Sequence, residues 1–297
     1  MSEWSPLERA DAPLAPLVGP FPSARFVEAW WRHRGSGVPV VAEARGSALP
    51  CVLNDGVLRL AGEADLTDYH SPLGSDLGGL LDAVMASVDG GTRIAFDSLP
   101  AEAAVPITAA LEVLGVAFTA SDHTATMTLD LPADVDEYLA ALEGKHRHEI
   151  RRKRRRFEEA FGAPGLRRDD SGFKAFVEMY RAAPGDKGEF MTVGMEAYFR
   201  DLLASPGWAV DLLVGAEGTP LAAAFGFEDE DAYYLYNSSF DPAAAEASPG
   251  IVLCDELIRN TIAARRPRFD FLKGREGYKR RFGAVPRPLT LIEAVLP

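Results

Sequence analysis

Hydrophobic and polar residues follow two different spacings along this chain of 297 residues, and each spacing predicts its own kind of element. Apolar residues three or four positions apart indicate helices, and short apolar or alternating runs between turn residues indicate strands. Helices are predicted at residues 24–34, 76–88, 101–114, 133–144, about 145–161, 173–183, 195–205, 248–265 and 276–283. Strands are predicted at residues 38–44, 48–54, 57–62, 92–99, 116–122, 124–131, 208–216, 220–228, 232–240, 268–272 and 288–296.

Turn and cap residues mark the ends of several of these elements. Asn54-Asp55-Gly56 predicts a tight hairpin turn, and Ser23 is predicted to cap the helix that follows it. Ser248 is likewise predicted as an N-cap, with Pro249 at the first helical position. Helices and antiparallel-looking strands are mixed in both halves. The sequence therefore predicts an α+β or mixed α/β fold with two domains, residues 1–122 and 123–297.

The charge of the chain is unevenly distributed. The formal net charge is −13. Residues 145–156 carry eight basic side chains and one acidic one, and residues 265–287 carry nine and two, so each segment has a net charge of +7 and the remainder −27. We expect these two segments to form a local anion site, because the acidic remainder disfavours a broad surface for RNA.

Several classes of protein are disfavoured by what the sequence lacks. No apolar run approaches the ~20 residues of a membrane helix, and the first residues do not resemble a secretory signal, so a cytoplasmic protein is expected. Cys51 and Cys254 suggest neither a disulfide framework nor a metal cluster. His146 and His148 would point to different sides of a helix, so no metal is expected. Arginine outnumbers lysine, which suggests a bacterial source with a GC-rich genome.

The first basic segment is predicted to lie on a helix. Arg147, Arg151, Arg154 and Arg155 are spaced to share one face, which suits the phosphates of a nucleotide, a cofactor or RNA. A solvated face paired with acidic residues is the alternative explanation. The segment lacks the interleaved aromatic residues that stack on bases, which disfavours nucleic acid as the main partner.

The second half resembles a known superfamily. Its predicted order is strand, helix, helix, three antiparallel strands, long helix, strand, short helix and strand, and this order resembles the GNAT N-acetyltransferases. Residues 145–285 resemble in particular the acetyltransferase-like group related to the cellulose-biosynthesis protein CelD and to the Fem-type peptidoglycan aminoacyltransferases. The residues that carry the resemblance are K145-H-R147-x-x-I150-R151-R152, Y236-N-S-S-F-D241, S248-P-G250-x-x-L253 and F269-D270-F271-L-K-G274-x-E276-x-Y278-K279-x-x-F282-G283. In the first half only FVEAWW and the T67-D68-Y69 segment match, and loosely; the resemblance nevertheless implies tandem GNAT-like halves.

The resemblance implies acyl transfer from a thioester to an amine, without a metal. An amine attacks the carbonyl carbon, an oxyanion develops, and the thiolate leaves. Tyr278 resembles the tyrosine that donates a proton to the leaving sulfur, and Lys279 the lysine that stabilises the oxyanion. Asp270 or Glu276 is expected to position the amine or accept its proton. The alternative is that Lys279 and the two arginines after it cap a short helix.

The expected ligands are an acyl-CoA donor and a small or sugar-like amine acceptor. The resemblance assigns the donor to Asn237, Ser248, Pro249, Gly250 and Lys273. It assigns the acceptor to Tyr69, Lys145, Arg147, Arg151 and Tyr236.

The sequence also departs from the GNAT pattern. It lacks the Q/R-x-x-G-x-G/A motif that binds the pyrophosphate of coenzyme A, and residues 240–250 take its place. Two alternative functions therefore remain open. One is a Fem-like transferase that uses aminoacyl-tRNA, and the other is a catalytically silent anion-binding module.

Overall fold

The chain forms two compact units in a computed structural model that describes residues 2–274 and 277–297. Unit 1 comprises Met1–Thr126 and Arg287–Pro297, and unit 2 comprises Met127–Pro286. The first division lies a few residues after the predicted boundary at 122/123, and the last strand returns to unit 1. The reason is strand pairing, because the C-terminal strand hydrogen-bonds to a strand of unit 1.

Unit 1 is a mixed sheet with helices. Its strand order is β1-β2-β3-β4-β11-β5. Within it β3 and β4 are parallel, whereas β1–β2, β2–β3 and β4–β11 are antiparallel. Its elements are η1 (Ser5–Glu8), α1 (Ala24–Arg34), β1 (Val38–Ala44), β2 (Ser47–Asn54), β3 (Val57–Leu60), α2 (Leu77–Ser87), β4 (Arg93–Pro100), α3 (Ala101–Val113), most of β5 (Phe118–Asp130) and most of β11 (Val285–Val295).

Unit 2 continues with the last residues of β5, in the strand order β5-β10-β9-β8-β7-β6. Strands β6 to β9 are antiparallel, and β10 is parallel to β9. Its elements are α4 (Val135–Ala141), α5 (Gly144–Phe161), β6 (Gly165–Arg167), α6 (Gly172–Ala182), α7 (Asp186–Phe190), α8 (Val193–Leu203), β7 (Trp208–Val214), β8 (Pro220–Glu228), β9 (Ala232–Phe240), η2 (Pro242–Ala247), α9 (Pro249–Ala263), β10 (Arg268–Lys273) and α10 (Gly277–Arg281).

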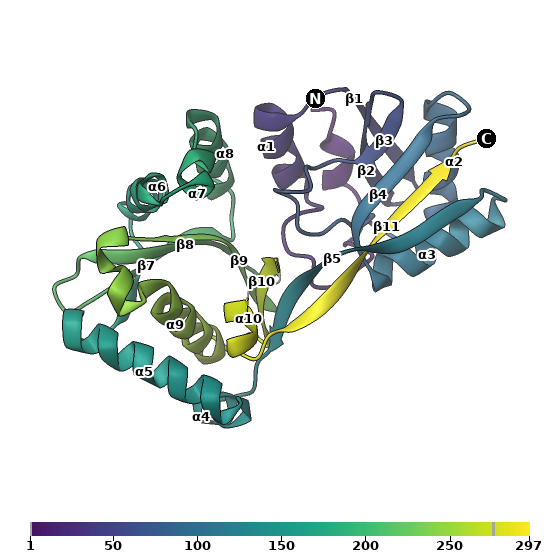
Figure 1. The fold of residues 1–297 in the computed structure, drawn as a ribbon. Helices are drawn as coiled ribbons and strands as arrows, with labels where there is room; N and C mark the ends of the chain where they lie inside the picture. The colour runs from purple at the N-terminus through teal and green to yellow at the C-terminus, as the bar shows by residue number, and fades with distance from the viewer. Residues whose placement is uncertain (1, 275–276) are drawn as a thin grey trace. The chain divides into compact units, whose positions relative to one another are not determined.

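Helices cover both faces of the sheet in unit 2 (Figure 1). Helix α9 packs on one face, where its apolar residues join those of β8, β9 and β10 in one core, and α5 packs on the far side of α9. Helices α6 and α8 pack on the opposite face through an aromatic cluster. That cluster comprises Phe173, Phe176, Tyr180, Tyr198, Phe199, Trp208, Phe225 and Tyr236.

The prediction of a mixed α/β fold is confirmed, as are most predicted elements and turns. The Ser23 hydroxyl accepts the Phe26 N–H at 3.3 Å, as an N-cap should. Asp55 and Gly56 take positive φ angles of 49° and 71° in the hairpin turn between β2 and β3. The strands predicted at 116–122 and 124–131 are wrong as two elements, because they form the continuous strand β5. Ser248 precedes α9 as predicted, but its side chain makes no capping hydrogen bond.

Candidate functional site

Strands β9 and β10 are paired along only part of their length. They are parallel in the register Arg268↔Ala232, Phe269↔Tyr233 and Asp270↔Tyr234. Both strands continue beyond this point, β9 to Phe240 and β10 to Lys273, with no further pairing between them among the described residues. Ligands of open sheets that contain parallel strands bind at the carboxyl ends of such strands, so this end of the pair is the natural place for a site.

A β-bulge in β9 lies just beyond the last paired residues. Phe225 pairs with Asn237 and Gly226 with Leu235, so Tyr236 is an extra residue on the β9 side. Successive side chains of a regular strand point to opposite faces, but here neighbouring side chains contact helices on the same face. The Tyr236 hydroxyl lies 3.2 Å from that of Tyr198 on α8, and Asn237 Oδ1 accepts a 2.8 Å hydrogen bond from Tyr180 on α6.

Asp270 is the buried carboxylate at this end of β10. Its Oδ1 accepts the N–H of Leu272 at 2.7 Å, and Leu272 has a φ of 58°, in the left-handed region that branched side chains rarely adopt. Phe269 and Phe271 belong to the core on the α9 side, so strand alternation places Asp270 on the α6 and α8 face. The structure thus places Asp270, Tyr236 and Asn237 on one face of neighbouring strands.

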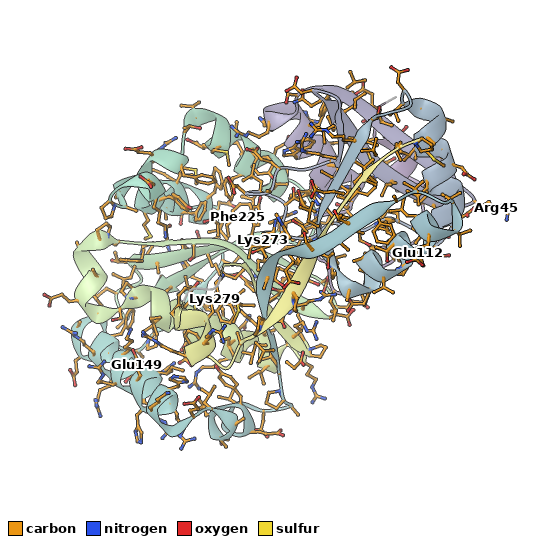
Figure 2. All side chains as sticks on the ribbon, turned by 45° about the vertical axis from the view of Figure 1, so that its right-hand side comes forward. Arg45, Glu112, Glu149, Phe225, Lys273 and Lys279 are labelled. Atoms are coloured by element: carbon orange, nitrogen blue, oxygen red, sulfur yellow. The ribbon has the colours of Figure 1, made fainter. Side chains whose placement is uncertain are left out.

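Lys279, labelled in Figure 2, is held inside unit 2 by backbone oxygens. It is 3% exposed, and its Nζ donates to the carbonyls of Leu272, Lys273 and Gly274 at 3.5, 2.6 and 3.2 Å. Burial raises the pKa of the nearby Cys254 thiol to about 12, although the Lys279 charge acts in the opposite direction. The ammonium therefore holds the end of β10 in position, and its role toward an oxyanion stays a prediction.

Tyr278 precedes Lys279 on α10. Its ring is half-buried and meets the edge of Phe271, with 6.2 Å between ring centroids and an interplanar angle of 81°. It packs against the core on the α9 side. Glu276, the other predicted carboxylate, lies outside the described residues. The structure therefore places Asp270 and Lys273 near the end of β10, and Tyr278 and Lys279 on α10, whose lysine contacts that strand end.

The start of α9 is the predicted phosphate position. Ser248 has a φ of 56°, Pro249 is buried, and Gly250 is half-buried beside Phe240. The N–H groups of Ile251 and Val252 both point to the Ser248 carbonyl, at 3.0 and 3.3 Å. The 3-10 helix η2 ends directly before this point and occupies the position of the missing glycine-rich motif. The α9 N-terminus keeps the positive end of its helix dipole.

The basic helix α5 uses its arginines in two ways. Arg147 donates from Nη1 to the carbonyls of Leu139, Ala140 and Leu142, so it caps the C-terminus of α4. Arg154 forms ion pairs with Asp255 and Glu256 on α9. Arg147 and Arg154, two of the four arginines predicted to share one face, therefore have internal partners, and phosphate binding by this face stays a prediction.

The other predicted acceptor residues differ in exposure. Lys145 is exposed and lies 2.9 Å from Glu143, and Arg151 is exposed. Tyr69 lies in the core of unit 1, where its hydroxyl is 2.5 Å from that of Thr126 and the Arg287 guanidinium lies 5.0 Å from its ring centroid. The role of Tyr69 toward a substrate stays a prediction.

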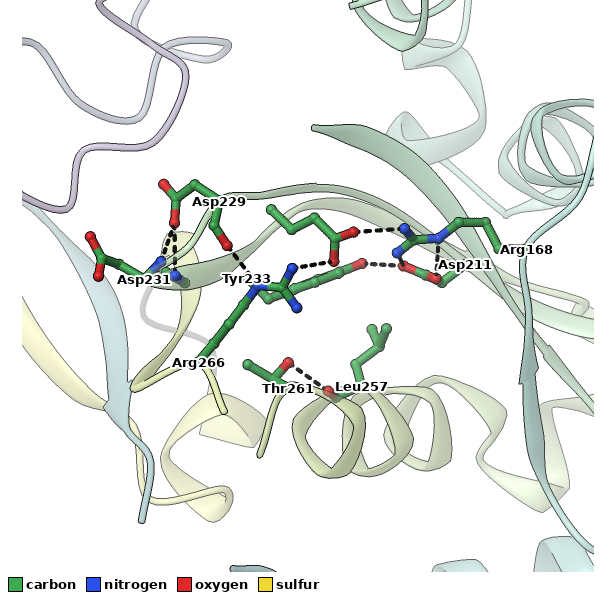
Figure 3. Close-up of polar contacts among 10 residues, drawn as sticks. Arg168, Asp211, Asp229, Asp231, Tyr233, Leu257, Thr261 and Arg266 are labelled. Carbon is green, nitrogen blue, oxygen red and sulfur yellow. Dashed lines mark hydrogen bonds and ion pairs between the residues drawn. The ribbon is translucent and has the colours of Figure 1, made fainter. Parts of the chain in front are cut away.

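A partly buried ionic network in unit 2 was not predicted from the sequence (Figure 3). Asp211 on β7 is 4% exposed and accepts two hydrogen bonds from Arg168, at 2.9 and 3.1 Å, and one from the Tyr233 hydroxyl at 2.8 Å. Arg168 also donates to Glu228 at 2.8 Å. The signal was an aspartate in the otherwise apolar run WAVDLLV. The network joins β6, β7, β8 and β9 and is structural.

This arrangement defines a class of protein. A long helix that follows one strand of a parallel pair, and a tyrosine on the short helix that follows the other, match the order that the sequence resemblance led us to expect. Residues 144–280 match the family model described as an acetyltransferase (GNAT) domain. Residues 144–280 therefore form a GNAT acyltransferase domain, and the resemblance found in the sequence is confirmed. No curated protein matches the sequence.

Solved structures share the fold over nearly the whole chain. A conserved protein of unknown function from Bacteroides thetaiotaomicron is 14% identical with a TM-score of 0.62, over 98% of this chain and 95% of that one. The C-terminal domain of a protein described as a lysylphosphatidylglycerol synthetase from Agrobacterium fabrum is 13% identical with a TM-score of 0.61. The match covers 99% of this chain and 92% of that one. FemX is 11% identical with a TM-score of 0.60, over 100% of this chain and 96% of that one. At these identities the likeness shows the fold alone.

Across the residues described, the structure has no helix that is both long enough and apolar enough to span a membrane.

Proposed function

We propose that the chain is an N-acyltransferase that moves an acyl group from acyl-CoA to the amine of a small or sugar-like acceptor. One observation carries the proposal. Strands β9 and β10 lose their pairing beyond Asp270 and Tyr234, next to the bulge at Tyr236. Strands that part in this way can hydrogen-bond an extended thioester arm through their backbones, as they would a further strand.

The proposed reaction uses groups on both sides of this strand end. The acceptor nitrogen attacks the thioester carbon and loses a proton to Asp270, directly or through water. The carbonyl oxygen becomes an oxyanion, then the C–S bond breaks and the Tyr278 hydroxyl protonates the departing thiolate. Lys279 is proposed to keep Tyr278 in position through its three carbonyl contacts. Tyr236 and Asn237 are proposed to line the acceptor side, and Lys273 with residues 248–250 the donor side.

Acyl-CoA binding is tested first by thermal denaturation. A ligand that binds the folded state raises the melting temperature, so acetyl-CoA or a longer acyl-CoA should raise it while CoA-free buffer does not. Tyr278→Phe and Asp270→Asn should then each lower turnover roughly ten-fold or more, because each removes a proton-transfer group. Tyr138→Phe is the matched control, since its hydroxyl bonds only the Phe282 carbonyl within the described contacts. Normal turnover in Tyr278→Phe and Asp270→Asn would remove these residues from the mechanism.

A second candidate is an aminoacyl-tRNA-dependent transferase. The observation that favours it is the start of α9, where η2 stands in place of a glycine-rich pyrophosphate loop. Fem-type enzymes, among which FemX shares the fold, are the source of this expectation. Transfer of a radiolabelled amino acid from charged tRNA to an amine, with no melting shift by any acyl-CoA, would support it. If neither a melting shift with acyl-CoA nor transfer from charged tRNA is observed, the catalytically silent anion-binding module is the function that remains.

A further inference from the structure

The outer face of α5 carries a row of exposed basic residues. A helix turns 100° per residue, so residues three, four and seven apart share a face. Those that share the face turned away from α9 are all exposed: Lys145, His148, Arg151, Arg152, Arg155 and Arg156. Figure 1 shows α5 along the outside of α9, and Glu149 marks this helix in Figure 2. We call these six residues the α5 ridge.

The residues on the inner face of α5 dock the helix on unit 2, and the ridge residues do not take part in this packing. Ile150 and Phe157 are buried in the core shared with α9. Lys153 pairs with Glu149 at 3.5 Å, and Arg154 pairs with acids of α9. Every ionic contact that docks α5 on α9 therefore comes from the face opposite to the ridge.

Three arginines of the ridge have no side-chain partner among the described residues, and two other members have only exposed acidic neighbours. Arg151, Arg152 and Arg155 make no ion pair or hydrogen bond to any side chain within the described ranges. Lys145 and Arg156 have exposed acidic neighbours. Like charges four residues apart, as in Arg151 and Arg155, destabilise a helix. The positive charges of the ridge therefore do not contribute to the stability of the fold.

We propose that the α5 ridge binds the phosphodiester backbone of single-stranded RNA. Four of its six residues are arginines, whose planar guanidinium groups bind phosphate oxygens in pairs. The spacing along the helix axis is about 1.5 Å per residue, so Arg151 to Arg155 spans about 6 Å and the full ridge about 16 Å. A strand lying along the ridge would meet successive guanidinium groups. Unpaired strands of this kind occur in the loops, bulges and ends of RNA.

A narrow partner fits the ridge better than a flat one. Exposed acids bound it at both ends, with Asp136, Glu137 and Glu143 before it and Glu158 and Glu159 after it. A membrane surface would face these acids as well as the arginines. Membrane-surface helices also insert apolar side chains, but the apolar residues of α5 are turned inward on α9.

The absence of aromatic residues from the ridge defines the kind of binding. With no aromatic side chain to stack on bases, the proposed contact is with the backbone and does not depend on sequence. The lack of aromatic residues in the basic segment therefore disfavours base recognition but not contact with the RNA backbone. The ridge has charge to neutralise about three or four phosphates, so the affinity depends steeply on salt. The proposal does not depend on which acyl donor the transferase uses.

The test uses the full chain and fluorescence anisotropy with a labelled oligouridylate and a labelled oligoadenylate. The triple variant Arg151→Gln, Arg152→Gln, Arg155→Gln should bind both strands at least about ten-fold more weakly at low salt. Its slope of log affinity against log salt should be smaller by about 2, as expected for three lost phosphate contacts. The matched control replaces three exposed arginines of unit 1 by glutamine, Arg25, Arg45 and Arg93, with the same change in net charge. It should bind like the wild type.

Several outcomes would overturn the proposal. One is that the wild type binds neither RNA strand, another is that the control variant loses as much RNA affinity as the triple variant, and a third is that the triple variant binds RNA like the wild type. Each of these results contradicts the proposal. Wild-type binding to vesicles of equal parts phosphatidylglycerol and phosphatidylcholine that exceeds its binding to RNA, and that is lost in the triple variant, would reassign the ridge to a membrane. Salt-sensitive self-association lost in the triple variant, without RNA binding, would reassign it to an acidic surface of a second copy. Circular dichroism of the triple variant should match the wild type, because the three replaced arginines are exposed.

Discussion

Several charged residues of unit 2 have more than one partner, and these partners decide the effect of a single substitution. Arg168 donates to both Asp211 and Glu228, and Arg266 lies 3.5 Å from the second oxygen of Glu228. Burial alone would raise the pKa of Glu228, but the hydrogen bond and charge of Arg168, together with the charge of Arg266, lower it. The carboxylate form is therefore favoured in the folded state.

This lowered pKa predicts a stability loss in acid. The pKa of Glu228 is lower in the folded than in the unfolded chain, where it is ~4.3. Its contribution to the free energy of unfolding is therefore complete above that value and is lost as the pH falls through the folded-state pKa. Urea denaturation from pH 7 to pH 3 should show a shallower acid decline for Glu228→Gln than for the wild type. The exposed Glu217→Gln is the control and should follow the wild-type curve. Parallel curves for Glu228→Gln and the wild type would contradict the prediction.

At the scale of elements, the β8–β9 pair joins the bulge to the ionic network. Gly226 on β8 pairs with Leu235, beside the bulge. A Cβ at Gly226 would lie 2.3 Å from the Tyr233 hydroxyl, which donates to Asp211. Glycine is required at this position because the phenol of the neighbouring strand passes directly over its backbone.

Gly226→Ala is therefore expected to destabilise unit 2. The added methyl would displace the Tyr233 phenol from Asp211, at a cost of about 1–3 kcal/mol in the free energy of unfolding. Gly194→Ala in α8 is the control, because its Cβ would lie 3.8 Å from the nearest atom and alanine favours a helix. Thermal and urea denaturation of both variants measure the difference. A loss no larger in Gly226→Ala than in Gly194→Ala would show that the phenol moves without cost.

At the scale of the whole chain, the C-terminal strand stabilises the unit in which the chain begins. Leu289 and Ile292 of β11 are fully buried, and β11 pairs antiparallel with β4 from Leu289↔Pro100 to Val295↔Arg93. Residues 127–286 thus form a unit inserted between two parts of unit 1. The chain must complete its last strand before unit 1 is complete.

Ile292→Ala should loosen unit 1 in particular. Loss of a fully buried isoleucine costs about 2–5 kcal/mol through lost burial and the cavity left behind. Hydrogen exchange with mass spectrometry should show faster exchange in peptides from residues 38–126 than from 127–286. Val295→Ala, at a position that is 57% exposed, is the control and should leave exchange nearly unchanged. Equal acceleration in both units would contradict the assignment of β11 to unit 1.

Local signals along the chain predicted most elements and the location of the GNAT domain. The N-cap at Ser23 and the turn at Asp55-Gly56 depend only on neighbouring residues, so they can be predicted from the sequence without knowledge of the fold. The long helix after Ser248 and the short one that contains Tyr278 were found in the same way. The bulge at Tyr236 could not be predicted, because a bulge is a property of two paired strands and β8 contributes half of it.

The sequence by itself determined the mixed fold, the acyltransferase class and the charge of α5. Tertiary structure decided what the charged residues do. It turned Arg147 and Arg154 inward and left Arg151 and Arg155 outside, because the apolar side chains of α5 set which face packs on α9. It buried Lys279 under three carbonyls at the end of β10. Charge is a local property of the chain, but its exposure and partners depend on elements that are distant in sequence.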